Sequence, residues 1–215
     1  MKVSNRGRFI TFEGGEGVGK TTQLGLLSET LRRAGILVLL TREPGGSIGA
    51  EEIRNLLVTG EIGRWDAISE ALLHFAARRD HVEKIIKPAL EDGKWVLCDR
   101  FIDSSMAYQG YGYGVGREKI EALQQFSIGK FVPDLTLIFD MPAAVGLARV
   151  VERDENKSRY EQLNSAFHER VRDGFYKIHI AEPKRCIIID AQDSIVAVQR
   201  TLKKVIVDRF NVDLA

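Results

Sequence analysis

Residues 14–21 read Gly14-Gly15-Glu16-Gly17-Val18-Gly19-Lys20-Thr21, which is the pattern Gly-x-x-x-x-Gly-Lys-Thr. This pattern is a P-loop. Its glycines let successive backbone N–H groups turn toward a triphosphate, its lysine can reach the β- and γ-phosphates, and its threonine hydroxyl can hold Mg²⁺. We therefore expect all eight residues to bind the triphosphate, with Lys20 in the catalytic set and Thr21 as a metal ligand.

The residues on either side of the octamer have the character that a P-loop needs. Residues 8–13 form a short apolar, β-branched and aromatic run, which predicts a strand,. Residues 22–34 place Leu24, Leu27 and Leu31 on one face, which predicts a helix,. The order strand, loop and helix is the context in which the octamer binds phosphate.

The length of 215 residues suits one α/β domain or two small ones, and we expect a single domain over residues 1–215,. Hydrophobic residues make up 44% of the chain, and the formal charge is +1, so nothing favours a nucleic-acid partner. No apolar run is long enough to cross a membrane, and the N-terminus lacks the apolar stretch of a signal peptide,. Cys98 and Cys186 lie in apolar runs, which favours buried, reduced thiols in a cytoplasmic protein.

Five nearly continuous apolar runs predict the strands of a parallel sheet covered on both faces. They are residues 8–13, 36–41, 95–99, 135–140 and 186–190. Helical patterns between them, for example over 67–92 and 117–130, predict right-handed βαβ units and a three-layer α/β fold,. The glycine-dense stretch 110–116 reads as a loop,.

The polar residues that follow these runs point to phosphoryl transfer, because ligands bind beyond the carboxyl ends of parallel strands. The guanine-binding motif Asn-Lys-x-Asp of GTPases is missing, which favours a small kinase. Asp99, which ends the third run, has the place of a Mg²⁺-binding carboxylate. Arg42, Arg78, Arg100 and the charged stretch 149–159 can offset the repulsion between two phosphate groups.

Several ordered motifs resemble the thymidylate kinase family of bacterial type. They are Gly-Gly-Glu-Gly-Val-Gly-Lys-Thr-Thr at 14–22, Thr-Arg-Glu-Pro-Gly-Gly at 41–46, Phe-Ala-Ala-Arg at 75–78, Asp-Arg at 99–100, Ala-Tyr-Gln-Gly at 107–110 and Pro-Asp-Leu-Thr at 133–136. The resemblance covers almost the whole chain. It implies a P-loop nucleoside-monophosphate-kinase fold, usually a homodimer, that converts ATP and dTMP to ADP and dTDP with Mg²⁺ in dTTP synthesis.

The resemblance also implies an acceptor site. Glu16 would face the deoxyribose near its 3′-hydroxyl, Arg100 would bind the dTMP phosphate with Arg42 beside it, and Arg78 would contact the thymine edge. The remaining acceptor residues would be Ser104 and Ser105 lining the base pocket, Tyr108 against the deoxyribose, and Gln109 covering the pocket. Asp99 and Thr21 would hold the metal.

Two positions, Gly17 and His74, distinguish this chain within the family that it resembles. One subtype of the family has an arginine inside the P-loop, where this chain has Gly17, so the resemblance moves the catalytic charge to a lid at about 149–160. Arg149, Arg153 and Arg159 are the candidates there, with Arg153 assigned to the transition state and Arg149 to ATP. The family commonly stacks thymine on a phenylalanine at the position of His74; an imidazole can also stack, and Phe75 is the alternative.

Two other functions remain open from the sequence. One is a kinase for another acceptor, such as dUMP or a deoxynucleoside. The other is a nucleotide-dependent interaction module that uses the P-loop as a switch. Acceptor-dependent turnover distinguishes the enzymes from the switch, and a panel of acceptors distinguishes the two enzymes.

Overall fold

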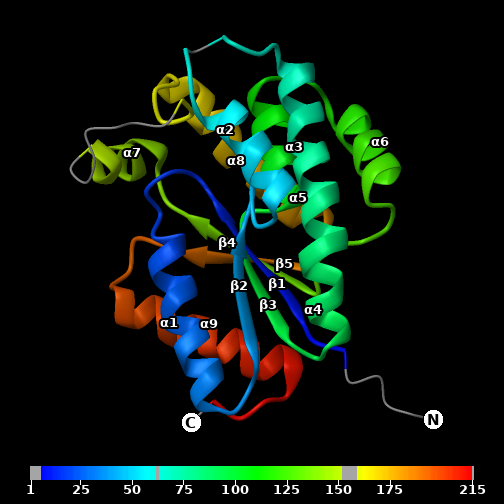
Figure 1. Cartoon of the computed structure of the whole chain (residues 1–215). Coiled ribbons are helices and arrows are strands. Elements are labelled where there is room, and N and C mark those ends of the chain that lie inside the picture. Colours follow the sequence, from blue (N-terminus) through cyan, green and yellow to red (C-terminus); the bar gives the residue numbers. More distant parts are fainter. Residues whose placement is uncertain (1–5, 62, 152–158, 215) are drawn as a thin grey trace.

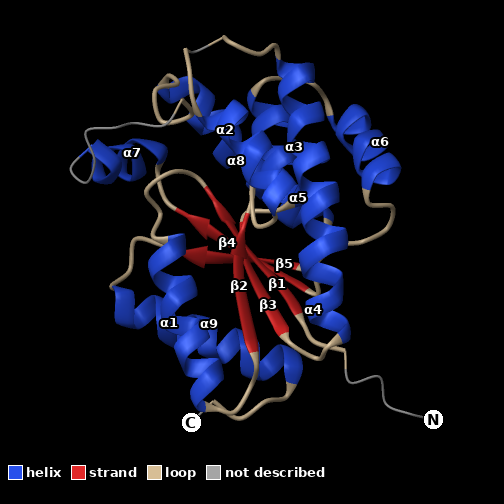
Figure 2. Cartoon of the chain, viewed as in Figure 1, coloured by secondary structure: helices blue, strands red, loops and turns tan. Residues whose placement is uncertain are grey.

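The computed structural model describes residues 6–61, 63–151 and 159–214. In these ranges five parallel strands form one sheet in the order β2-β3-β1-β4-β5. Helices cover both faces of this sheet, so the α/β prediction of three layers is confirmed (Figures 1 and 2). Within the same ranges no helix combines the length and the apolar character needed to span a bilayer.

The strands lie close to the predicted runs. They are β1 (Phe9–Gly14), β2 (Val38–Arg42), β3 (Trp95–Asp99), β4 (Leu135–Asp140) and β5 (Cys186–Asp190). The largest difference is at β2, which begins two residues later than the predicted start at 36. Ile36 belongs instead to the turn that closes the preceding helix, where its N–H donates to the Leu31 carbonyl at 3.0 Å.

One or more helices lie between successive strands, and a last helix follows β5. They are α1 (Lys20–Arg33), α2 (Ile48–Val58), α3 (Ala67–His81), α4 (Lys87–Glu91), α5 (Ile102–Ser105), α6 (Arg117–Ser127), α7 (Ala143–Val151), α8 (Ser165–Ala181) and α9 (Ile195–Phe210). Two segments are π-helical. The first, η1 (Val82–Ile86), joins α3 to α4, and the second, η2 (Met106–Gly112), extends α5. The predicted helix over 67–92 is therefore continuous but contains a π-helical turn.

Two apolar cores flank the sheet, and β1 contributes to both because its side chains alternate. Ile10 and Phe12 pack with Leu27 of α1 and Leu202 of α9 on one face. Phe9 packs on the other face with residues of α3, α4, α6 and α8. In Figure 1 the pair α1 and α9 lies below the sheet, and α3, α6 and α8 lie above it.

The prediction of a loop over 110–116 is wrong for its first half, because Gly110 and Gly112 belong to η2. A Cβ atom at Gly112 would lie 2.9 Å from the ring of Phe167 in α8. One at Gly110 would lie 3.2 Å from the sulfur of Met106. These two glycines therefore allow close helix packing, which a sequence pattern does not distinguish from a flexible turn.

Candidate active site

The P-loop joins β1 to α1 at the carboxyl edge of the sheet. Gly19 precedes α1 with a φ of 86°, a left-handed conformation that glycine adopts without strain. The buried Lys20 ammonium donates to the carbonyl oxygens of Gly14 at 3.2 Å and Gly15 at 2.7 Å. Burial and the positive charge of Arg100 lower the pKa of Lys20 to about 8. The lysine is thus held against the loop that would carry the phosphates.

Thr21 and Asp99 meet at the predicted metal position. The Thr21 hydroxyl in the first turn of α1 donates to Asp99 Oδ2 at 3.0 Å, at the end of β3. A hydroxyl and a carboxylate oxygen are hard ligands of the kind that Mg²⁺ binds while keeping several of its waters. In the described ranges no cluster of three or more His, Cys, Asp or Glu side chains could form a protein-only metal cage. The two residues fit a magnesium ion that takes its other ligands from water and a nucleotide.

Arg100 lies between the P-loop and η2, with an unusual backbone conformation. Its φ is 68°, which is rare for a residue with a side chain. Its guanidinium donates to the Gly14 carbonyl at 2.9 Å and to Glu16 Oε1 at 2.9 Å, and the Tyr108 hydroxyl donates to the same oxygen at 2.8 Å. Burial raises the pKa of Glu16, but Arg100 and other neighbours outweigh it and lower the value to about 2. The structure therefore brings together the predicted residues Glu16, Arg100 and Tyr108.

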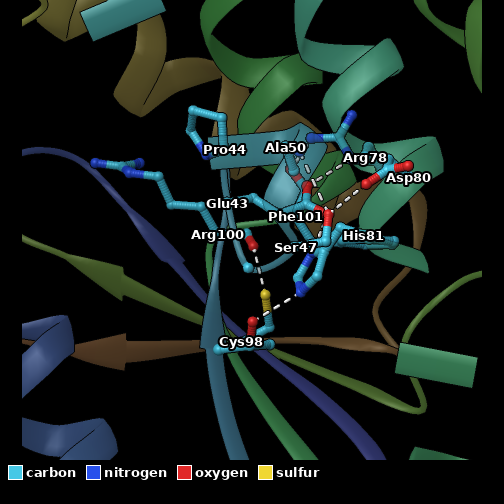
Figure 3. Close-up of polar contacts among 12 residues, drawn as sticks. Glu43, Pro44, Ser47, Ala50, Arg78, Asp80, His81, Cys98, Arg100 and Phe101 are labelled. Carbon is cyan, nitrogen blue, oxygen red and sulfur yellow. Dashed lines mark hydrogen bonds and ion pairs between the residues drawn. The ribbon is translucent and has the colours of Figure 1, made fainter. Parts of the chain in front are cut away.

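Arg78 of α3 is almost fully buried and is drawn in Figure 3 together with its partner Glu43. Its Nε donates to Glu43 at 2.7 Å, Nη1 donates to the Ser105 hydroxyl at 3.0 Å, and Nη2 donates to the Phe101 carbonyl at 3.0 Å. Within the described residues, one N–H on each terminal nitrogen remains for a bound molecule. The second Glu43 oxygen lies 3.0 Å from His81 Nδ1. Glu43 therefore compensates the charge of Arg78 and fixes its orientation.

His74 and Phe75 occupy different environments. Phe75 is 3% exposed and belongs to the core above the sheet. His74 is half-buried, lines the cavity, and forms a 2.8 Å hydrogen bond with the Tyr160 hydroxyl through Nε2. Burial and the nearby positive charges, Arg78 first, lower the pKa of His74 to about 3. Of the two candidates, His74 is thus the ring that faces the cavity, as a neutral imidazole.

A cavity of about 250 Å³ opens between the P-loop, α2, α3 and η2. Its walls include the predicted acceptor residues Glu16, Arg42, His74, Arg78, Arg100, Ser104, Ser105, Tyr108 and Gln109, together with Asp99. Residues absent from the prediction also line it, namely Glu43, Pro44, Arg54, Val58, Phe101, Tyr160 and Glu161. The cavity has the size of a small organic ligand and an excess of arginine at one end.

Three arginines gather at that end of the cavity. Arg42 donates to both oxygens of Glu51 at 3.1 Å and is half exposed. Arg54 in α2 donates to the Pro44 carbonyl at 2.7 Å, and burial lowers its pKa. Together with Arg100 they form a cluster of positive charge, which favours an anion there.

The lid candidates lie in separate places. Arg149 is in the last turn of α7, and Arg153 lies outside the described residues. Arg159 is 3% exposed, pairs with Glu70 of α3, and donates through Nε to the Leu57 carbonyl at 3.1 Å. It therefore attaches the start of the segment 159–164 to the acceptor side of the molecule. Glu70 also accepts from Gln109 at 2.9 Å, so the predicted pocket cover is held by the same carboxylate.

The absence of an arginine at Gly17 has a steric reason. Gly17 has a φ of 68°, and a Cβ atom there would lie 2.0 Å from the Gly146 carbonyl oxygen in α7. A Cβ atom at Gly146 would lie 2.3 Å from the Glu16 carbonyl oxygen. The P-loop and α7 therefore touch backbone to backbone, with no space for a side chain on either.

The residues that the prediction missed had different signals. Glu43 follows β2 inside the quoted stretch 41–46, so its position at a strand end was visible. Arg54 lies in the middle of α2, and Tyr160 follows a charged stretch, so neither carries a local pattern. Both reach the cavity only because α2 and the segment after α7 fold over it.

Comparison with known proteins gives one consistent result. The family profile described as thymidylate kinase matches residues 12–202. A thymidylate kinase of Caulobacter vibrioides is 50% identical over 205 residues, covering 95% of this chain and 98% of the relative. A thymidylate kinase of Afipia carboxidovorans is 54% identical over 188 residues, covering 86% and 82%. The crystal structure of thymidylate kinase from Ehrlichia chaffeensis matches with a TM-score of 0.75 and 42% identity, covering 94% of this chain and 98% of that one.

Proposed function

The chain belongs to the thymidylate kinase family and phosphorylates dTMP to dTDP; we propose that the 250 Å³ cavity holds dTMP and that ATP binds with Mg²⁺ at the P-loop. The P-loop and the cavity share Glu16, Asp99 and Arg100 at their junction. This arrangement supports direct transfer between two nucleotides, because the two phosphate sites adjoin at the carboxyl edge of one sheet. The product dTDP is one phosphorylation short of dTTP.

The base would lie at the Arg78 end of the cavity. The remaining N–H groups of Arg78 suit the carbonyl oxygen of a pyrimidine, and His74 offers a neutral ring face for stacking,. Ser105 keeps Arg78 in place, and Gln109 covers the same region from η2. These contacts favour a flat, uncharged base over a larger purine.

The sugar and the acceptor phosphate would lie toward the P-loop. Glu16 stays ionised and accepts hydrogen bonds, so it suits a 3′-hydroxyl donor,. Tyr108 lies against Glu16 and would limit space beside the sugar. Arg100, with Arg42 and Arg54 nearby, would bind the phosphate whose oxygen attacks the γ-phosphorus of ATP,.

The transferring phosphoryl group needs positive charge from several sides. Lys20 would leave its loop carbonyls to contact the β- and γ-phosphates, and Arg153 would approach from the lid with Arg149 near ATP. Thr21 and Asp99 would hold Mg²⁺, directly or through water. When bound, the ion neutralises phosphate charge and orients the β- and γ-oxygens.

The position of Arg100 between the P-loop carbonyl of Gly14 and Glu16 is the observation that carries the assignment of the acceptor site. The test is a coupled assay of ADP release with dTMP, dUMP, dCMP, dGMP and thymidine as acceptors. We expect dTMP to be turned over with the highest kcat/KM. Arg100→Ala should raise the KM for dTMP by roughly a hundredfold or more and change the KM for ATP little.

Turnover of dUMP or thymidine equal to that of dTMP would contradict the assignment of thymine recognition to this cavity. ATP binding without acceptor-dependent ADP release would instead favour a nucleotide switch. An unchanged dTMP KM in Arg100→Ala would remove Arg100 from the acceptor site while leaving the kinase activity intact.

We also propose that the protein is a cytoplasmic homodimer. Cys98 and Cys186 are buried and free, as a reducing compartment allows,. Leu72 and Ile68, one turn apart on α3, are about half exposed at 51% and 49%, and Phe126 on the adjoining α6 is 91% exposed. Exposed apolar side chains on two helices that pack together support self-association through α3 and α6.

A further inference from the structure

A buried carboxylate, Glu13, has no role in the contacts described so far. It is the next-to-last residue of β1, beside the P-loop, and is 0% exposed. Three other acidic side chains in the described ranges are buried, and each has a cationic partner: Glu43 with Arg78, Glu70 with Arg159, and Asp103 with Arg185. Within those ranges Glu13 is the buried acid without an ion pair.

An unpaired buried carboxyl group is costly, so its hydrogen bonds indicate what it does. Glu13 Oε1 accepts the backbone N–H of Phe101 at 2.7 Å, and Oε2 accepts the Ser104 hydroxyl. Burial first, and then the charge of Asp103, raise the pKa of Glu13 well above its ordinary value. Both oxygens therefore face the turn that connects β3 to α5.

This turn needs support from outside because of its own conformation. Arg100 has a φ of 68°, and the Phe101 side chain has no oxygen with which to cap α5. Glu13, which belongs to another strand, instead accepts the N–H of Phe101 and the hydroxyl of Ser104, one residue before α5 and one within it. The Arg100 N–H also donates to the Phe12 carbonyl at 2.9 Å, so β1 holds the two backbone N–H groups of the turn, while Cys98 and Arg78 donate to the carbonyls of Arg100 and Phe101.

The guanidinium of Arg100 is held by residues next to Glu13. Its Nη1 donates to the Gly14 carbonyl at 2.9 Å and to the Ser104 hydroxyl oxygen at 3.2 Å. Ser104 in turn donates to Glu13. The backbone and the side chain of Arg100 are thus both fixed relative to Glu13, through Phe101 on one path and Ser104 on the other.

We propose that Glu13 is a positioning residue that holds the turn at Arg100, and so aims the guanidinium at the acceptor phosphate. The proposal rests on the proposed role of Arg100 in binding dTMP. Glu13 acts through hydrogen bonds that its oxygens accept, and it touches neither substrate.

The test compares Glu13→Leu with Glu13→Gln. Leucine has a similar size and accepts no hydrogen bond, whereas glutamine keeps one acceptor for Phe101 and can donate to the Ser104 oxygen. We expect Glu13→Leu to raise the KM for dTMP about tenfold or more, since small misplacements of a binding group are costly, with the KM for ATP changed by less than about twofold. Glu13→Gln should return the dTMP KM to within about threefold of the wild-type value.

Thr11→Val is the matched control. Thr11 is buried two residues earlier on the same face of β1, and its hydroxyl bonds to Thr136 at 2.9 Å rather than to Phe101 or Ser104; Thr136 in turn donates to Asp103 in α5. This variant loses a buried hydrogen bond, so it should lower the melting temperature without raising the dTMP KM. A rise in dTMP KM as large as that of Glu13→Leu would show a general effect of destabilising β1 and would overturn the proposal.

Two further measurements separate this proposal from the proposed function. If Arg100→Ala raises the dTMP KM but Glu13→Leu does not, or if Glu13→Gln is as impaired as Glu13→Leu, the positioning role is wrong and the kinase assignment stands. If Arg100→Ala has no effect, the acceptor role of Arg100 is wrong, and amide hydrogen exchange of the protein without nucleotides decides the rest. Faster exchange of the Phe101 amide in Glu13→Leu, but not in Thr11→Val, supports Glu13 as the anchor of the turn; unchanged exchange overturns it.

Discussion

Glu16 is the P-loop residue whose side chain faces the acceptor cavity. Arg100 and Tyr108 both donate to its Oε1, and the neighbouring positive charges keep its pKa near 2. The carboxylate is therefore ionised at neutral pH. It can accept a hydroxyl proton in a hydrogen bond, but it is too weak a base to remove one.

Glu16→Gln should lower kcat/KM for dTMP by roughly tenfold, because a charge-assisted hydrogen bond to the 3′-hydroxyl becomes a neutral one. Steady-state kinetics with dTMP and with 3′-deoxy-dTMP would measure this. With the 3′-deoxy acceptor neither protein can form the contact. The ratio of the wild-type kcat/KM to that of the variant should therefore fall toward one. A difference that is equally large for both acceptors would place Glu16 away from the sugar.

His74 makes the stability of the fold depend on pH. The folded-state pKa is about 3, below the ordinary value of 6.5. As the pH falls below 6.5, the unfolded chain takes up a proton that the folded protein resists, so the free energy of unfolding should decrease from pH 6.5 toward pH 3. His74→Phe should weaken this decrease, as measured by urea unfolding at several pH values. Parallel pH profiles for the two proteins would contradict the low folded-state pKa.

At the level of elements, the strands could be predicted because each is a short apolar run with a polar residue at its end. The helices α1, α3 and α6 could be predicted because apolar residues recur in them with the helical period. That period could not locate η1 or η2, since a π-helical turn inserts one residue without changing which residues are apolar. In η2 the glycines were read as a loop signal, although Gly112 allows close contact with α8 and Gly110 lies against Met106 and Ile120.

The segment 159–164 depends on the ion pair between Arg159 and Glu70, both at most 3% exposed. Arg159→Leu should reduce the free energy of unfolding by about 3–5 kcal/mol, because Glu70 would remain buried without a partner. Replacing both residues by leucine should recover most of this loss. Chemical denaturation of the two single variants and the double variant forms the cycle. Additive losses would show that the two side chains do not act as a pair.

At the scale of the whole molecule, the polar ends of five parallel strands meet at one edge, and this could be foreseen from their order along the chain. It placed Lys20, Thr21, Asp99 and Arg100 near one another. The partners of the buried acids Glu43, Glu70 and Glu13 were not foreseeable, because each lies on an element far away in sequence. Arg54 is the clearest example of a residue that the sequence could not assign to the cavity. It lines the cavity only because α2 folds over it.

The assembly can be tested at the same scale. If α3 and α6 form the interface, Phe126→Asp should convert a dimer of two 24.1 kDa chains into monomers, because a buried unpaired carboxylate strongly disfavours association. Multi-angle light scattering at several concentrations measures the mass. Ile180→Asp is the control, since Ile180 is 73% exposed on α8, a different helix. Loss of the dimer in the control alone would place the interface elsewhere.

The backbone contact between Gly17 and Gly146 also restricts how this lineage can evolve. A side chain at Gly17 would collide with a carbonyl at 2.0 Å, and one at Gly146 with another at 2.3 Å. An arginine at position 17 would fit only after α7 had moved away from the P-loop. A change from one subtype to the other therefore needs both steps together, so the effect of each depends on the other.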